Sequence, residues 1–339
     1  MELTPHIIKT GNHAYRYLRY DSIDSFHDFV NGRIKALSTK NRETWQNRLH
    51  AAQHRINTGA DFYGTPPPTH LDELENHDRF LGMHLLKALQ PKIKKHLHRY
   101  LTHVTQKLLP RPRIAYTDKG TGMFSFDRAA IGLHRTHRID TSSPIHTHIS
   151  QLRIALEKYS YTTGVKKVYA YFKDQPIAYP TVRIYLKAGG NAKVKGDDLL
   201  YTGLGCSEVA RFMEQHGIAV EVNVLVGSTF QHTTIMGIIP VKRFGDPLDH
   251  NLLLLLSSDP RYFRFRGFKA LIAQADFFKL KIPESLGSTH PKMAEQFIDV
   301  LGNDGFVFEH SYSLEDAANE VKRIIDTYHQ HLTTHGKAA

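Results

Sequence analysis

Residues 182–226 decide the fold, and they read VRIYLKAGGNAKVKGDDLLYTGLGCSEVARFMEQHGIAVEVNVLV. Two β-prone runs frame this stretch, Thr181–Leu186 and Ile218–Val226, and the second is the strongest strand pattern in the chain. Between them, a glycine pair predicts a turn, and the segment that ends at Gln215 predicts a helix. Strand, helix and strand in this order predict two parallel strands joined by a crossover.

The alternation of strands and helices continues on both sides of this stretch. Further strands are expected at 167–172, 233–241 and 305–309, and helices at 268–278 and from Ser313 onward. The leucine run at 251–257 fits either a strand or a buried helix. This order predicts an α/β domain over 165–335, with a mostly parallel, doubly wound sheet covered by helices on both faces.

The segments before residue 165 differ in character. Residues 1–113 are expected to be mainly helical and basic, with helices near 21–30, 44–55 and 83–109 and a short one after Thr69. Pro91 should kink or divide the longest of these helices. Residues 114–164 show no sustained periodicity and are expected to be an irregular connecting segment.

The quoted stretch resembles the first strand, loop, helix and second strand of von Willebrand A-like domains. Residues 246–272, DPLDHNLLLLLSSDPRYFRFRGFKALI, resemble a segment of an uncharacterised family of such proteins encoded by phages and mobile elements. The resemblance extends loosely over 20–335. It implies a fold and a genomic context, but no established activity.

The loop after the first strand departs from the wider von Willebrand A pattern, which places Asp-x-Ser-x-Ser there to coordinate a divalent cation. The corresponding residues are Lys187, Gly189, Gly190, Asn191 and Lys193. They offer no carboxylate and no hydroxyl, so no metal site is expected. Exposed backbone N–H groups and two lysines could hold a phosphate at this edge, although a tight turn explains the glycine pair more simply.

Charge is distributed unevenly along the chain, whose formal net charge is +11. Residues 1–180 hold 27 Lys+Arg against 15 Asp+Glu, a balance of +12, whereas residues 181–339 hold 17 against 18, a balance of −1. A basic surface attracts polyanions such as nucleic acid. The single cysteine excludes an internal disulfide, and no apolar run is long enough to span a membrane, so we expect a cytoplasmic protein without membrane contact.

Two clusters combine cations with aromatic rings, which supply phosphate contacts and stacking surfaces for unpaired bases. The first comprises Lys92, Lys94, Lys95, Arg99, Arg111, Arg113 and Tyr116. The second is the alternating run Arg261-Tyr262-Phe263-Arg264-Phe265-Arg266, in which a strand would place the arginines on one face. A solvated helix face explains the first cluster equally well, and core aromatics with surface arginines explain the second.

Catalysis has no clear sequence signature. The pairs His134/His137 and His146/His148 could bind a metal, but chance spacing explains them in a chain with 23 histidines. Cys206 is expected to be a buried structural thiol. The sequence therefore predicts no catalytic residue and no cofactor, and favours a non-catalytic nucleic-acid-binding or scaffold protein of a phage or mobile element. A protein–protein assembly module or homo-oligomer is the alternative, and a metal-dependent hydrolase is a third.

Overall fold

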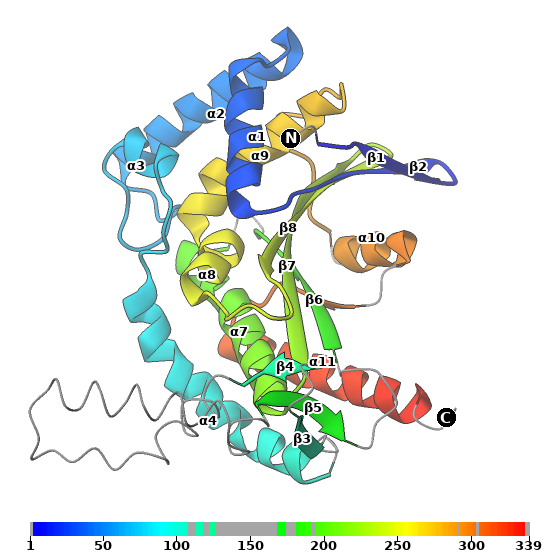
Figure 1. Ribbon diagram of the computed structural model, residues 1–339. Coiled ribbons are helices and arrows are strands. Elements are labelled where there is room, and N and C mark those ends of the chain that lie inside the picture. The colour runs from blue at the N-terminus through cyan, green and yellow to red at the C-terminus, as the bar shows by residue number, and fades with distance from the viewer. Residues whose placement is uncertain are drawn as a thin grey trace, which may run out of the picture. The chain divides into compact units, whose positions relative to one another are not determined.

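The structure, a computed structural model, describes residues 3–107, 113–117, 122–125, 168–173, 181–190, 194–290, 292–302 and 305–335. The chain divides into two compact units (Figure 1). Unit 1 joins residues 1–109 to residues 180–339, and unit 2 comprises residues 110–179. The N-terminal region and the C-terminal α/β residues therefore form one unit, where the sequence suggested a helical region followed by a separate domain.

Unit 1 is built on a mixed six-stranded sheet with the order β1-β2-β8-β7-β6-β9. Its strands are β1 (His6–Thr10), β2 (His13–Arg19), β6 (Thr181–Lys187), β7 (Ala219–Phe230), β8 (Thr233–Lys242) and β9 (Phe306–Phe308). Three of the five neighbouring pairs are parallel: β2–β8, β6–β7 and β6–β9. This confirms an α/β class with a mostly parallel sheet, and it confirms the strand expected at 305–309, which lies at one edge of the sheet as β9.

The N-terminal residues contradict the prediction of a mainly helical region. β1 and β2 form an antiparallel hairpin around Gly11, whose φ of 57° suits a glycine, and β2 pairs in parallel with β8. Tyr15 and Tyr17 alternate along β2 and pack in a buried cluster with Phe297 of α10. The period of two is a strand signal, but the two tyrosines lie in a segment only seven residues long.

Of the central strands, β6 and β7 pair in parallel as predicted, whereas β7 and β8 do not. β6, the helix α7 (Leu200–Gln215) and β7 form the expected parallel crossover. β7 and β8, in contrast, form an antiparallel hairpin in which Phe230 pairs with Thr233. Gln231 adopts a φ of 52° in the two-residue turn. Gly, Asn or Asp usually occupies such a position, so the sequence of this turn did not predict the hairpin.

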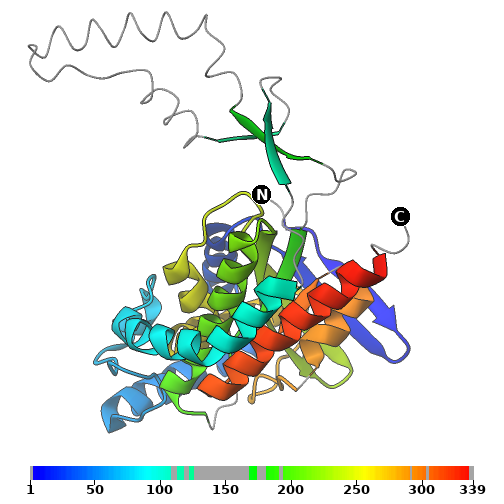
Figure 2. The ribbon, with the colours of Figure 1, turned by 90° about the horizontal axis from the view of Figure 1, so that it is seen from below.

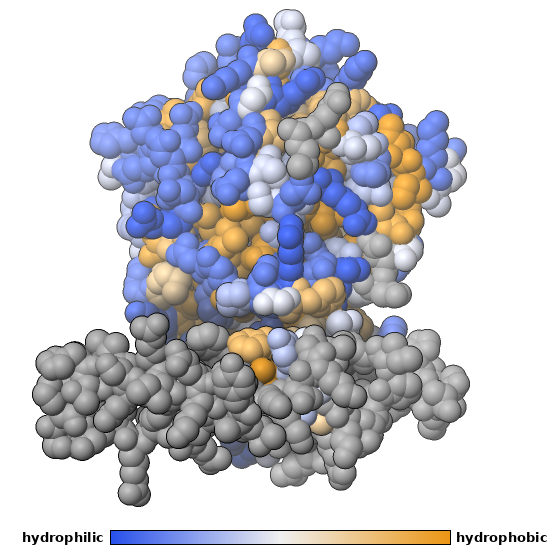
Figure 3. All heavy atoms as spheres, in the orientation of Figure 1, coloured by the Kyte–Doolittle hydropathy of each residue, from blue (hydrophilic) through white to orange (hydrophobic). Residues whose placement is uncertain are grey.

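Helices cover the two faces of the sheet unequally (Figure 1). α10 (Met293–Leu301) packs on one face, against a smaller core that includes Tyr185 and Val307. The larger core lies on the other face, where side chains pack from α1 (Ile23–Lys35), α2 (Thr39–Thr58), α3 (Leu71–Glu75), α4 (Met83–Lys107), α7, α8 (His250–Ser258), α9 (Phe268–Phe277) and α11 (Leu314–His335). In the view of Figure 3, hydrophilic residues dominate the described surface, with smaller hydrophobic groups between them.

Most predicted helices are confirmed, with altered bounds. The leucine run at 251–257 is helical, in α8, and it is almost completely buried. α1 begins with a capping box in which Ser22 and Ser25 satisfy each other's backbone N–H groups. The 3₁₀ turn η1 (Gly196–Leu199) precedes α7, and the π-helical turn η2 (Tyr262–Gly267) precedes α9.

A single buried carboxylate joins α1, α2 and α9. Asp276 of α9 accepts hydrogen bonds from Arg33 Nε (2.7 Å), the Ser38 backbone N–H (3.1 Å), the Ser38 hydroxyl and Asn41 Nδ2 (3.0 Å). Burial opposes ionisation of Asp276, but the hydrogen bonds of Ser38 and Asn41 and the charge of Arg33 outweigh it, so the pKa of this carboxyl lies below its usual range.

Unit 2 contains a three-stranded antiparallel sheet with the order β3-β5-β4. Its strands are β3 (Arg113–Thr117), β4 (Met123–Phe124) and β5 (Tyr169–Lys173). The strand expected at 167–172 therefore exists, but it belongs to this small sheet and not to the α/β sheet of unit 1.

Candidate functional site

Helix α4 presents a basic face to solvent. It contains six Lys or Arg residues and no Asp or Glu over 25 residues. Lys87, Lys92, Lys95 and Arg99 are exposed and Lys94 is partly exposed. The opposite stripe, Leu86, Ile93, Leu97 and Val104, is buried. The spacing of the two sets matches the 3.6-residue period, and the helix predicted near 83–109 is confirmed.

The cations of this face are not neutralised within the described part of the chain. Lys92, Lys94, Lys95 and Arg99 form no ion pair with a described residue. We call these four residues the α4 basic face. Because helical neighbours of like charge repel one another, a row of cations without acids is a feature that folding alone does not favour.

The other members of the first predicted cluster lie elsewhere. Arg113 and Tyr116 belong to strand β3 of unit 2, and Tyr116 is partly buried. Arg111 lies outside the described residues. The cluster inferred from the sequence is thus divided between two units, and only its α4 part is described as a surface.

Polar contacts fix α4 against the neighbouring helices α7 and α11. The Tyr100 hydroxyl donates to Asp326 Oδ1 of α11 at 2.6 Å, and Gln90 Nε2 donates to Glu208 Oε1 of α7 at 3.1 Å. Figure 2 shows α4 and α11 side by side. Burial, together with the carboxylate of Asp326, raises the pKa of Tyr100. These anchors were not predicted, since 226 residues separate Tyr100 from its partner.

Pro91 does not divide α4, so the predicted division is wrong. The helix continues from Met83 to Lys107 with Pro91 inside it. A proline removes the N–H that would bond to the carbonyl four residues earlier, which belongs to Lys87. Both Pro91 and Lys87 are exposed, so water can satisfy that carbonyl. The basic face therefore extends without a break.

The second predicted cluster is not a basic surface. Its residues form the π-helical turn η2 and the position before it, not a strand, and Arg261 and Arg264 are each only 3% exposed. Arg264 donates to the carbonyl oxygens of Phe62 and Val194, and Arg266 donates to that of His77. Burial, and then the charge of Arg55, lower the pKa of Arg264 to about 10. These arginines hold loops together, and the strand on which the hypothesis depended does not exist.

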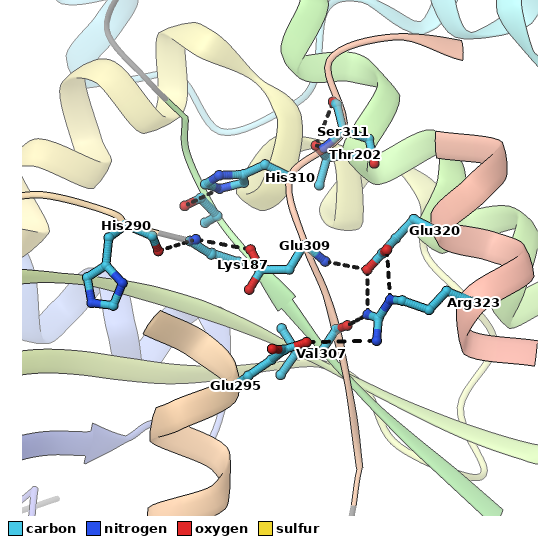
Figure 4. A network of polar contacts seen from close by, with 11 residues as sticks. Lys187, Thr202, His290, Glu295, Val307, Glu309, His310, Ser311, Glu320 and Arg323 are labelled. Carbon is cyan, nitrogen blue, oxygen red and sulfur yellow. Dashed lines mark hydrogen bonds and ion pairs between the residues drawn. The ribbon is translucent and has the colours of Figure 1, made fainter. Parts of the chain in front are cut away.

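A buried ion pair lies at the end of β6, directly before the loop where the resemblance implied a lost metal site (Figure 4). Lys187 is 2% exposed, and its Nζ donates to Glu309 Oε2 at 3.0 Å and to the carbonyl of His290 at 3.0 Å. A carboxylate from the residue after β9 therefore neutralises Lys187. Since its charge is paired internally, Lys187 is not available to a phosphate.

A second ion pair continues this network along the outer edge of β9 (Figure 4). Glu320 of α11 accepts the backbone N–H of Glu309 at 2.9 Å, and Arg323 donates to Glu320 and to the carbonyl of Val307. These side chains occupy backbone groups that an added strand would use.

Burial, and then the charge of Lys187, lower the pKa of His310 to about 3, so His310 is neutral near pH 7.

The glycines of the same loop are packed against side chains. A Cβ on Gly189, whose φ is 93°, would lie 2.1 Å from the Phe263 ring, and one on Gly190 would lie 2.5 Å from Leu199. This close packing supports the tight-turn explanation of the glycine pair. Asn191 and Lys193 lie outside the described residues.

The remaining candidates for chemistry are a cysteine and two histidine pairs. Cys206 is fully buried, and burial raises the pKa of its thiol to about 12. No group of three or more His, Cys, Asp or Glu among the described residues is placed to hold a metal ion. The pairs His134/His137 and His146/His148 lie outside those residues. Within the same part of the chain, no helix has the length and apolarity that a membrane span needs.

Comparison with known protein families matches about half of the chain. Residues 166–333 match the model of a family described as Domain of unknown function (DUF7192). No curated protein and no solved structure matches the chain. The matched range begins within unit 2, three residues before β5, and ends within α11. It therefore excludes the α4 basic face.

Proposed function

We propose that this protein binds nucleic acid without catalysing a reaction, as a binding or scaffold component, and that the α4 basic face contacts the phosphates. The observation that carries the proposal is a long helix whose exposed side holds only basic and neutral residues and whose four central cations form no ion pair with any described residue. Lys92 and Arg99 are seven residues apart, which corresponds to about 10 Å along a helix. That length matches a few successive phosphates of a strand.

Charge along the chain supports the same reading. The excess of +12 lies in residues 1–180, where α4 also lies, and residues 181–339 carry −1. Two further proposals concern the fold family and the genomic context of the protein. The β6–α7–β7 crossover fits a von Willebrand A-like layout in which an internal ammonium replaces the metal. The context of a phage or mobile element rests on the sequence resemblance alone.

The test compares two variants with equal loss of charge. One is Lys92→Gln/Lys94→Gln/Lys95→Gln/Arg99→Gln, and the other removes exposed lysines outside α4: Lys35, Lys40, Lys279 and Lys281. Binding of a fluorescein-labelled oligonucleotide is measured by anisotropy across a salt titration. Each lost phosphate contact reduces the slope of log K against log salt by about 0.7 for a single strand, so four contacts predict a reduction of roughly 3.

The control variant should change the slope much less, because it removes charge without removing contacts. Equal effects of the two variants would mean that net charge alone attracts the ligand and would refute the assignment to α4. Absence of salt-dependent binding by the wild-type chain would refute the proposed function itself, and would leave protein assembly as the better explanation.

A further inference from the structure

Unit 2 exposes two large apolar side chains that are adjacent in sequence. Met123 is 66% exposed and Phe124 is 50% exposed, and together they form the two-residue strand β4. Exposed phenylalanine loses the stabilisation that burial provides, so its presence on a short edge strand calls for another explanation.

The register of the sheet places these two residues in different rows. Phe124 lies opposite Tyr169 of β5, and Tyr169 lies opposite Thr117 of β3. Met123 lies opposite Ala170, which in turn lies opposite Tyr116. Because successive residues of a strand point to opposite faces, Phe124 and Tyr169 share one face, whereas Met123 belongs to the other.

The Phe124 and Tyr169 rings contact each other without stacking. Their centroids are 5.6 Å apart and their planes meet at 67°, which is a T-shaped arrangement. In such a pair, one ring keeps both of its faces free of the other ring. A flat apolar group can therefore stack on the pair without displacing either ring.

The charge of the surrounding segment indicates which class of ligand carries the flat group that stacks on Phe124 and Tyr169. Residues 110–179 contain 11 Lys or Arg and 5 Asp or Glu, a balance of +6. A basic segment with an exposed aromatic pair combines the two features by which proteins hold unpaired nucleotides, namely phosphate attraction and base stacking. A neutral apolar partner would gain nothing from this charge.

We propose that Phe124 and Tyr169 form a stacking platform for the bases of single-stranded nucleic acid. This inference rests on the proposed function and narrows its ligand, because the bases of a duplex stack on one another and offer only their edges. The platform and the α4 basic face contribute separately: the first selects unpaired bases, and the second adds affinity for any phosphate backbone.

The experiment uses the full-length chain and two labelled probes, a 20-nucleotide oligo(dT) and a 20-base-pair duplex, in the same buffer. Stacking of one base contributes enough that Phe124→Ala should weaken oligo(dT) binding about tenfold and leave duplex binding almost unchanged. Met123→Ala is the matched control, since it truncates the exposed apolar neighbour on the opposite face. Phe124→Trp should preserve binding, and Phe124→Leu, which keeps the apolar area but lacks a ring, should not.

The outcomes separate this inference from the proposed function. Equal binding of oligo(dT) by wild type and Phe124→Ala would overturn the platform, as would equal losses in Phe124→Ala and Met123→Ala. If Phe124→Ala has no effect while neutralisation of the α4 basic face abolishes binding, the platform fails and the proposed function holds. If the wild-type chain binds neither probe, both fail.

Discussion

Replacement of Asp276 by alanine should destabilise unit 1 more than most single substitutions. The side chain is 1% exposed, and it accepts hydrogen bonds from Arg33, Ser38 and Asn41. Removing one member of a buried charged pair costs about 3–5 kcal/mol. Part of the loss is recovered, since Arg33 is 33% exposed and can rehydrate and Asn41 keeps its bond to the Leu280 carbonyl. We expect about 3 kcal/mol.

The effect is measured by urea unfolding of wild type, Asp276→Ala and the control Asp28→Ala, which changes an exposed carboxylate of α1. A loss of about 3 kcal/mol corresponds to roughly 10 °C in Tm for a domain of this size. The control should lie within about 0.5 kcal/mol of wild type. A loss below about 1 kcal/mol in Asp276→Ala would refute the structural role assigned to this carboxylate.

The pH dependence provides an independent check on the same residue. The folded pKa of Asp276 is depressed, so its contribution is complete above the unfolded pKa of about 3.9 and is lost as pH falls through the lower folded value. The difference in unfolding free energy between wild type and Asp276→Asn should therefore be constant from pH 7 to about 5 and shrink below pH 4. A difference that stays constant down to pH 2.5 would contradict the ionised state proposed for Asp276.

Three further predictions concern single contacts. Lys187→Met should lower the free energy of unfolding by about 3 kcal/mol and leave oligonucleotide binding unchanged. In a double-mutant cycle, the same substitution should cost less in a Glu309→Gln background. Weakened binding with intact stability would instead indicate that Lys187 belongs to a ligand site. Tyr100→Phe should cost about 1 kcal/mol in urea unfolding, through the lost hydrogen bond to Asp326, and an unchanged midpoint would count against this anchor of α4. Cys206 should react with a thiol reagent at pH 8 only at the rate of unfolding, and rapid labelling of native protein would show that the thiol is accessible.

Local sequence signals predicted much of the secondary structure. The helices α1 and α4 and the β6–α7–β7 crossover were each predicted from residues within one segment. β1 and β2 carried such signals too, in the alternation along β2 and in Gly11 at the turn, and they were missed because the hairpin is short. The basic face of α4 was predicted for the same reason, since exposure and charge on one helix depend on that helix alone.

Contacts between distant segments could not be predicted in this way. The alternation of arginines and aromatics before α9 suggested a strand. Arg264 is instead buried, where it donates hydrogen bonds to the carbonyl oxygens of Phe62 and Val194. Lys187 forms its ion pair with Glu309, which lies 122 residues later in the sequence. In both cases the burial of a cation depends on an acceptor supplied by tertiary structure, which no pattern in the local sequence reports.

The pairing of β2 with β8 has a consequence for how the chain is made. The two strands meet in parallel although residues 20–232 separate them, and residues 110–179 of that interval belong to unit 2. At roughly 5–20 residues per second, a ribosome needs on the order of 10–40 s to synthesise β8 after β2 has formed. During that time the first hairpin lacks its neighbouring strand, so it cannot complete its place in the sheet until β8 has been synthesised.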